Sequence, residues 1–178
     1  MKRKTDEVEV SLDFVEENSQ IETGDDVLDH LLETLFFYME SPVRIQASGD
    51  LPHHLWEDTG ILIGRALRGD LEEARIARYG KALIPMDEAL VLCAVDISRP
   101  HLNFDLNPPE EEDGFSPILA RQFLDGLTRT LEATIHLKQL DGRNSHHVIE
   151  AGFKALGVGL AEALEGSERL ESTKGDLR

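Results

Sequence analysis

The chain has 178 residues, with 35 acidic against 18 basic side chains and a formal net charge of -17. Nucleic acids and anionic membranes are bound by basic faces, so this charge argues against both as partners. The length suits one well-cored domain, or two small halves that share a core.

Apolar periodicity in the first part of the chain predicts two short strands, a helix, a strand and a second helix. The segments are, in order, 7–14, 20–22, 27–35, 43–47 and 52–67. Asp25 and Asp26 precede the first helical run, as is typical of a helix start, and Pro42 ends it. The segment 20–22 is interpreted as a return of the first strand.

The second part repeats this order of elements. Its segments are 88–96, 102–106, 118–131, 134–140 and 146–164. We interpret 75–81 as a charged connector, and the acidic run 108–114 as a solvated loop without a further role. We therefore expect an α+β domain of two pseudo-equivalent β-β-α-β-α halves, approximately 1–70 and 71–164, with helices layered on one face of the sheets. The tail 165–178 has no core-forming pattern.

A pattern of two adjacent histidines and a glutamate occurs twice, once at the start of the second helix of each half. Four of the seven histidines belong to it. The residues are His53, His54 and Glu57 in the first motif, and His146, His147 and Glu150 in the second motif. On a helix the glutamate lies one turn from both histidines, so each motif gathers three metal-binding groups.

Each histidine pair has a geometric problem as a metal site. Neighbouring side chains on a helix project about 100° apart, so one pair does not easily bind a single ion. Two motifs that face each other, each giving one histidine to each of two ions, would solve this problem. The repeat therefore predicts a dinuclear metal site, and a layer of helices would bring the two motif helices side by side.

The remaining features concern the compartment and the internal repeat. Cys93 lies in an apolar run, which indicates a buried thiol in a reducing compartment. No signal peptide or run of membrane-spanning length is evident, so we expect a cytoplasmic protein. Matching the halves aligns 27–32 with 119–124, which makes Gln122 the counterpart of His30.

These patterns resemble the imidazoleglycerol-phosphate dehydratase family of histidine biosynthesis over nearly the whole chain. The blocks that carry the resemblance are 23–24, 28–32, 49–58, 78–80, 85–90, 96–100, 134–137, 144–155 and 172–175. The resemblance implies a ribosomal protein S5 domain 2-like fold. It also implies a hydro-lyase that dehydrates imidazole glycerol phosphate to imidazole acetol phosphate.

The resemblance further implies two Mn(II) ions per active site. The residues at the family's metal-binding positions are His30, His53, His54, Glu57, Gln122, His146, His147 and Glu150. Gln122 stands where the family often has histidine, and an amide oxygen is a weaker ligand for Mn(II) than imidazole. Tyr38 likewise stands where a second histidine is frequent.

Substrate binding and proton transfer are assigned by the same resemblance. The residues implied to hold the substrate are Glu7, His30, Arg78, Arg99, Lys154, Ser172 and Lys174, so the tail would contribute to phosphate binding. Glu7, Glu57 and Glu150 are the candidate catalytic carboxylates. The proton to be removed has no carbonyl beside it, so the substrate's imidazole must accept the electron pair, and bound metal would stabilise that state.

The resemblance also implies an assembly, in which trimers close into a twenty-four-subunit cage when metal binds. Two other functions stay open: a non-catalytic paralogue whose metals staple subunits together, and a dinuclear metal hydrolase. The phosphate-binding set favours the dehydratase. His136 is open between a structural group and a ligand, and His101 is interpreted as structural or surface.

Overall fold

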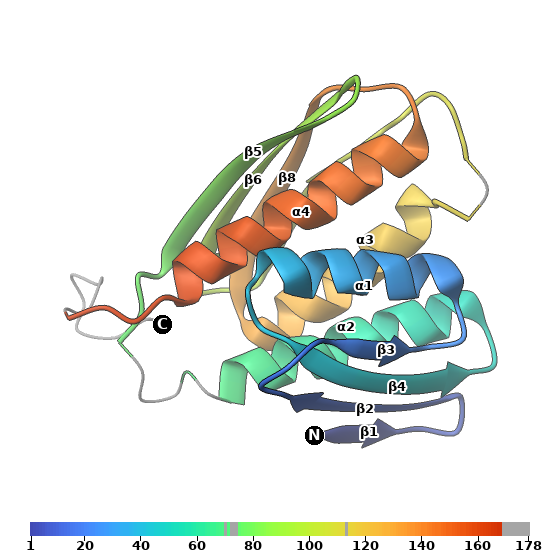
Figure 1. Cartoon of the computed structure of the whole chain (residues 1–178), viewed down its shortest axis with the longest axis vertical. Coiled ribbons are helices and arrows are strands. Elements are labelled where there is room, and N and C mark those ends of the chain that lie inside the picture. Colours follow the sequence, from blue (N-terminus) through green and yellow to red (C-terminus); the bar gives the residue numbers. More distant parts are fainter. Residues whose placement is uncertain (70, 72–74, 113, 169–178) are drawn as a thin grey trace.

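Two four-stranded sheets enclose four helices in the computed structural model, which describes residues 1–69, 71, 75–112 and 114–168 (Figure 1). The first half contains β1 (Lys2–Lys4), β2 (Val8–Phe14), β3 (Gln20–Glu22), α1 (Asp26–Tyr38), β4 (Val43–Gly49) and α2 (Pro52–Gly69). The second contains β5 (Tyr79–Met86), β6 (Ala89–Ile97), β7 (His101–Asp105), α3 (Pro117–Leu131), β8 (Ala133–Asp141) and α4 (Ser145–Leu164). The expected α+β fold of two similar halves is confirmed.

The strand order is the same in both sheets: β1-β2-β4-β3 and β5-β6-β8-β7. The short strands β3 and β7 pair in parallel with β4 and β8 rather than returning along β2 and β6. A helix separates the two strands of each parallel pair, as parallel crossovers require. This pairing corrects the expectation of two returning strands.

Each half also begins with an edge strand that the sequence pattern did not reveal. In the first half this is β1, whose three residues are all basic, and in the second it is β5, which begins inside the expected charged connector. Charged side chains suit an edge strand because they discourage pairing with another chain. In β1 they also hide the alternation on which the prediction of strands depends.

The helices pair across the two halves. A Cβ atom added at Gly60 of α2 would lie 2.1 Å from the carbonyl oxygen of Phe123 in α3, and one added at Gly157 of α4 would lie 2.6 Å from that of Leu35 in α1. Glycine thus lets each pair of backbones approach closely. The main helix contacts are α2 with α3 and α1 with α4, so each motif helix packs on the other half's first helix. The expectation that the motif helices lie side by side is not met.

The predicted start of α1 is confirmed and is tied to the first motif. The Asp25 side chain accepts hydrogen bonds from the backbone N–H groups of Val27 and Leu28, which caps the helix. The fully buried indole of Trp56 donates to the other carboxylate oxygen of Asp25 at 2.9 Å. One aspartate therefore fixes both the beginning of α1 and the first turns of α2.

Two further features are the environment of the single cysteine and the hydropathy of the helices. Cys93 is fully buried in β6, as expected, and burial raises the pKa of its thiol to about 12. None of the helices within the described ranges is long and apolar enough to cross a membrane.

Candidate metal centre

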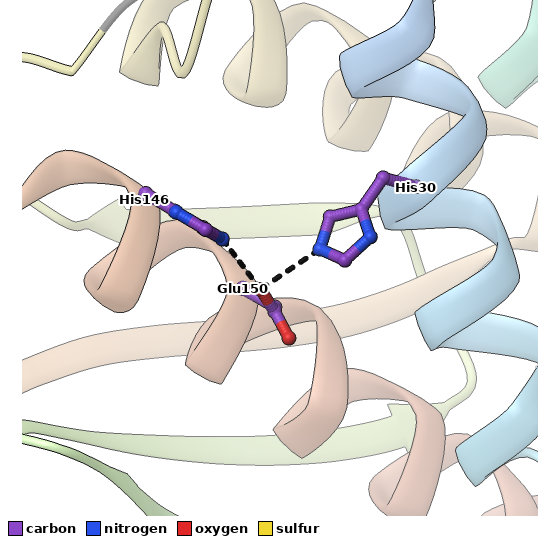
Figure 2. Close-up of side chains that lie close together, drawn as sticks. All are labelled: His30, His146 and Glu150. Carbon is purple, nitrogen blue, oxygen red and sulfur yellow. Dashed lines mark hydrogen bonds and ion pairs between the residues drawn. The ribbon is translucent and has the colours of Figure 1, made fainter.

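Three of the expected metal ligands meet within the single chain. The Nε2 atoms of His30 and His146 each lie 2.8 Å from the same carboxylate oxygen, Oε2 of Glu150 (Figure 2). One ligand atom from each residue lies within 4.8 Å of the others, which is close enough for one ion to touch all three. We call these residues the second-motif centre; among the described residues it is the only such group of three.

The second-motif centre depends on both halves of the fold. His146 and Glu150 lie one turn apart on α4, while His30 comes from α1, which packs against α4. The helix α4 begins at this point because the Asn144 side chain caps it by accepting from the backbone N–H of His147. The first-half His30 therefore serves the second motif, an exchange that follows from the crossed packing of the helices.

A carboxylate contacts the Nδ1 atom of each histidine of the second motif. Glu112 Oε1 lies 3.2 Å from Nδ1 of His146, and Glu88 Oε2 lies 2.6 Å from Nδ1 of His147. In a metal-bound histidine, a carboxylate that accepts the Nδ1 proton fixes the tautomer and orients the Nε2 lone pair toward the ion. Glu112 belongs to the acidic run that was interpreted as a loop without a role, so that interpretation is wrong.

Glu88 is held in place more firmly than an ordinary surface carboxylate. Its Oε1 atom accepts from the backbone N–H groups of Asn144 and Arg143, both at 3.0 Å. These two bonds, together with the contact to His147, lower the pKa of Glu88 to about 2. The pKa of His147 is raised in turn, chiefly by Glu88. Neither glutamate carries a local sequence signal for this role, because both partners are distant in the chain.

Glu150 is buried and nevertheless ionised. Burial raises its pKa, but hydrogen bonds from His30, Lys154 and His146 outweigh that effect and lower it to about 2. Lys154 lies one turn further along α4, with Nζ 2.9 Å from Oε1 of Glu150, and also contacts Met86. The lysine thus binds one carboxylate oxygen and leaves the other to the two imidazoles.

The first motif has a different environment. Nδ1 of His54 lies 2.8 Å from Asp50 and 3.7 Å from Glu7, while the His53 ring packs on the His54 ring with centroids 4.1 Å apart. The hydrogen bond to Asp50 is the main cause of a raised pKa at His54 and of a lowered pKa at Asp50. The structure therefore brings Glu7 beside the first motif but does not join this motif to the second-motif centre.

The hydrogen bond that Glu57 makes is with neither histidine of its motif. Its Oε1 atom accepts a hydrogen bond of 3.0 Å from the Arg129 guanidinium of α3. Glu57, Arg129 and Gln122 line one open cavity of about 450 Å³ together with Asp125 and His101. Within the part of the chain that the structure describes, the buried Oε1 of Gln122 has no hydrogen-bond partner.

The structure describes some, but not all, of the residues expected to bind phosphate. The Arg78 guanidinium binds Asp96 at 2.7 and 3.2 Å, and Ser98 donates to the same carboxylate. Arg99 lies exposed just beyond β6. Ser172 and Lys174 lie outside the described residues.

The residues left open by the sequence lie away from the second-motif centre. The rings of His136 and His101 contact each other across β7 and β8, with centroids 5.6 Å apart. Tyr38 lies at the end of α1, where it packs on Phe37 and lines a cavity of about 1300 Å³. His30 lies two turns earlier on that helix, about 12 Å away.

Comparison with known proteins gives a consistent result. Residues 23–160 match the family model for imidazoleglycerol-phosphate dehydratase. The enzyme of that name from Pyrococcus furiosus is 49% identical over 178 residues, covering 99% of this chain and 100% of the relative. That from Lachnoclostridium phytofermentans is 38% identical, covering 98% of this chain and 95% of the relative.

Two crystal structures of such enzymes share the fold. The Pyrococcus furiosus structure superposes with a TM-score of 0.94 at 49% identity, covering 98% of this chain and 99% of the other. The Staphylococcus aureus structure gives a TM-score of 0.83 at 32% identity, covering 94% of this chain and 98% of the other. Since the family model spans most of the chain and the relatives match its full length, the chain belongs to the imidazoleglycerol-phosphate dehydratase family of hydro-lyases.

Proposed function

We propose that the chain dehydrates imidazole glycerol phosphate to imidazole acetol phosphate, with two Mn(II) ions per active site. The observation that carries this proposal is the second-motif centre, which gathers His30, His146 and Glu150 within one family member. The metal-binding positions carried over from the family are His30, His53, His54, Glu57, Gln122, His146, His147 and Glu150. Among the residues that the structure describes, no specific contact favours a hydrolase or a purely structural metal.

The donor set fits the proposed ion. Two imidazole nitrogens and a carboxylate oxygen suit a divalent first-row metal such as Mn(II), and the remaining coordination positions would be left for substrate. Glu112 and Glu88 lie behind His146 and His147, an arrangement that orients histidine ligands in metal sites. When bound, the metal would supply Lewis-acid stabilisation of the negative charge that develops on the substrate's imidazole.

The carboxylates differ in what they can do with protons. Because the pKa of Glu150 is about 2, this group is ionised near neutral pH, which suits a metal ligand better than a group that takes up and releases protons. Glu7 is exposed and lies 3.7 Å from His54, beside a cavity of about 290 Å³ at the turn between β1 and β2. We assign to Glu7 the proton transfer at the substrate, and to Glu57 a role as a second ligand.

Binding of the phosphate requires a local cluster of positive charge in a chain of net charge -17. The set proposed for it is Arg78, Arg99, Lys154, Ser172 and Lys174. Arg78 is held by Asp96 and Lys154 by Glu150, so both cations are placed before substrate arrives. The tail 165–178 would complete this single catalytic domain by bringing Ser172 and Lys174 to the phosphate.

We further propose that the complete site forms between subunits, in trimers that close into a twenty-four-subunit particle. The support is the separation of the Glu7–His54 contact from the second-motif centre within one chain. The outer face of the second sheet also leaves large apolar side chains uncovered, with Leu83 54% and Leu92 36% exposed on paired strands. The expected cytoplasmic location stays a prediction.

The direct test is an assay of the purified full chain with imidazole glycerol phosphate, after chelation and after addition of Mn(II). We expect activity only with the metal, and analytical ultracentrifugation should show a small species converting to a large particle as Mn(II) is added. Full activity in the chelated protein would refute the metal dependence. A chain that is fully active as a monomer would refute the shared site.

A further inference from the structure

The two motifs place cations against their glutamates in different ways. At Glu150, the cation is Lys154 of the same helix, and the two side chains are 9% and 19% exposed. At Glu57, the position one turn further along α2 is Ile61, which offers no charge. The cation comes instead from Arg129 of α3, and the two side chains are 43% and 58% exposed.

This difference in exposure matters because it decides how easily each pair separates. An ion pair near the surface is screened by water and contributes little to stability, so water or another ion exchanges with it readily. A buried pair is fixed, since separating it leaves charges without solvent. Arg129 is therefore a displaceable partner of Glu57, whereas Lys154 is a permanent partner of Glu150.

The surroundings of Glu57 also leave an acceptor unused. The close contact between Gly60 and Phe123 holds α2 against α3, so that Glu57 and Gln122 line one cavity. The Oε1 atom of Gln122 is buried and has no hydrogen-bond partner among the described residues. The hydrogen bond of Arg129 goes to Glu57 and not to Gln122. A buried acceptor without a donor is unfavourable, so the Gln122 side chain gains a partner if it rotates and turns this oxygen toward a cation in the cavity.

We propose that Arg129 is a gatekeeping counter-ion of the first motif, which neutralises Glu57 until a divalent cation displaces it. The cation then gains the Glu57 carboxylate, and Arg129 swings toward solvent. Arg129 thus acts as a positioning residue that raises the Mn(II) concentration needed at the first motif. The ion that binds Glu57 consequently loads after the ion at the second-motif centre. This inference rests on the proposed Mn(II) dependence.

The test measures Mn(II) binding to the metal-free full chain by isothermal titration calorimetry, with free Mn(II) followed by electron paramagnetic resonance. In Arg129→Met the weaker class of sites should tighten about threefold to tenfold, because both the competing ion pair and the repulsion of the incoming ion are removed. Arg129→Lys keeps the charge and should stay near the wild type. Neither readout depends on turnover.

Arg44→Met is the matched control. Arg44 lies on β4, is exposed and donates a hydrogen bond to Gln20, so its replacement removes the same charge without touching Glu57 or the cavity beside it. Its Mn(II) affinity should equal that of the wild type. A second control is Arg129→Met in a Glu57→Gln background, where the gain should vanish if it passes through that carboxylate.

The possible outcomes separate this inference from the one on which it rests. Mn(II) binding to the wild type with no gain in Arg129→Met, or an equal gain in Arg44→Met, would overturn the role of Arg129 and leave the metal dependence standing. Absence of Mn(II) binding in every variant would overturn both. A gain in Mn(II) affinity that is confined to Arg129→Met and depends on Glu57 would establish Arg129 as the counter-ion.

Discussion

The second-motif centre and the first motif have the same sequence pattern on equivalent helices, yet their side chains meet different partners. Glu150 receives two imidazoles and a half-buried lysine, whereas Glu57 receives an exposed guanidinium from a neighbouring helix. The equivalent of His30 is Gln122, whose buried oxygen has no partner in the described chain. A repeated backbone therefore does not ensure repeated chemistry.

The difference arises from two single positions. Lys154 on α4 corresponds to Ile61 on α2, and His30 on α1 corresponds to Gln122 on α3. The first exchange removes the cation that the motif's own helix would supply, and the second removes an imidazole. The buried Ile61 packs against α3 near Gly126, so the exchange of lysine for isoleucine replaces a charge by an apolar contact.

The largest effect should follow removal of the Glu150 charge. We expect Glu150→Gln to lower kcat at least about 100-fold and to release bound Mn(II), because this carboxylate is the common partner of both imidazoles. Glu57→Gln should reduce the Mn(II) stoichiometry less. Metal analysis and kinetics on both variants check this. Equal loss of metal in the two variants would mean that the motifs act as one unit.

The next effect concerns the close contact that places Glu57 beside Gln122. In Gly60→Ala the new methyl group would meet the Phe123 carbonyl oxygen at 2.1 Å. We expect a loss of about 2–4 kcal/mol in the free energy of unfolding, measured by urea denaturation. Gly157→Ala, with a contact of 2.6 Å in the other helix pair, should lose less.

Gly69→Ala is the control for these glycine variants. A Cβ atom there meets nothing within 4 Å, so this change should be neutral or slightly stabilising, since alanine favours a helix over glycine. Unchanged stability in Gly60→Ala would show that α2 and α3 separate at little cost.

A smaller effect is expected from the carboxylate behind His147. Glu88→Gln weakens the acceptor that fixes the ring, so Mn(II) affinity at the second motif should fall about 10-fold to 100-fold. Glu110→Gln provides the comparison, because Glu110 binds the Arg143 side chain and no motif histidine. Calorimetric titration of both variants measures the difference. Equal affinities would leave Glu88 with a purely structural role.

The smallest effect is expected from a substitution that makes the two motifs more alike. In Gln122→His an imidazole replaces the amide oxygen, so half-saturation with Mn(II) should require about threefold to tenfold less metal. Assembly followed by sedimentation should shift to the same lower concentration. Arg44→His adds a histidine to the exposed strand β4, away from this cavity, and should change neither value. Weaker binding by Gln122→His would show that the cavity does not accept an imidazole ligand.

Much of the fold was determined by local patterns in the sequence. Apolar periodicity predicted the helices, and Asp25 predicted where α1 begins, because capping involves backbone groups only two or three residues away. The two motifs could be recognised because the residues of each are neighbours in the chain. The basic strand β1 could not be predicted, since its charges hide the alternation of a strand.

The crossed packing of the helices was decided by tertiary structure alone. Glycines such as Gly60 and Gly157 read as weak helix formers in the sequence, and only the fold shows that they are points of close approach. That packing placed His30 with the second motif rather than with its own half. It also brought Arg129 to Glu57 across 72 positions of the chain, and Glu112 to His146 across 34. Such contacts leave no local pattern, because the groups meet only when the helices and the acidic loop have taken their places.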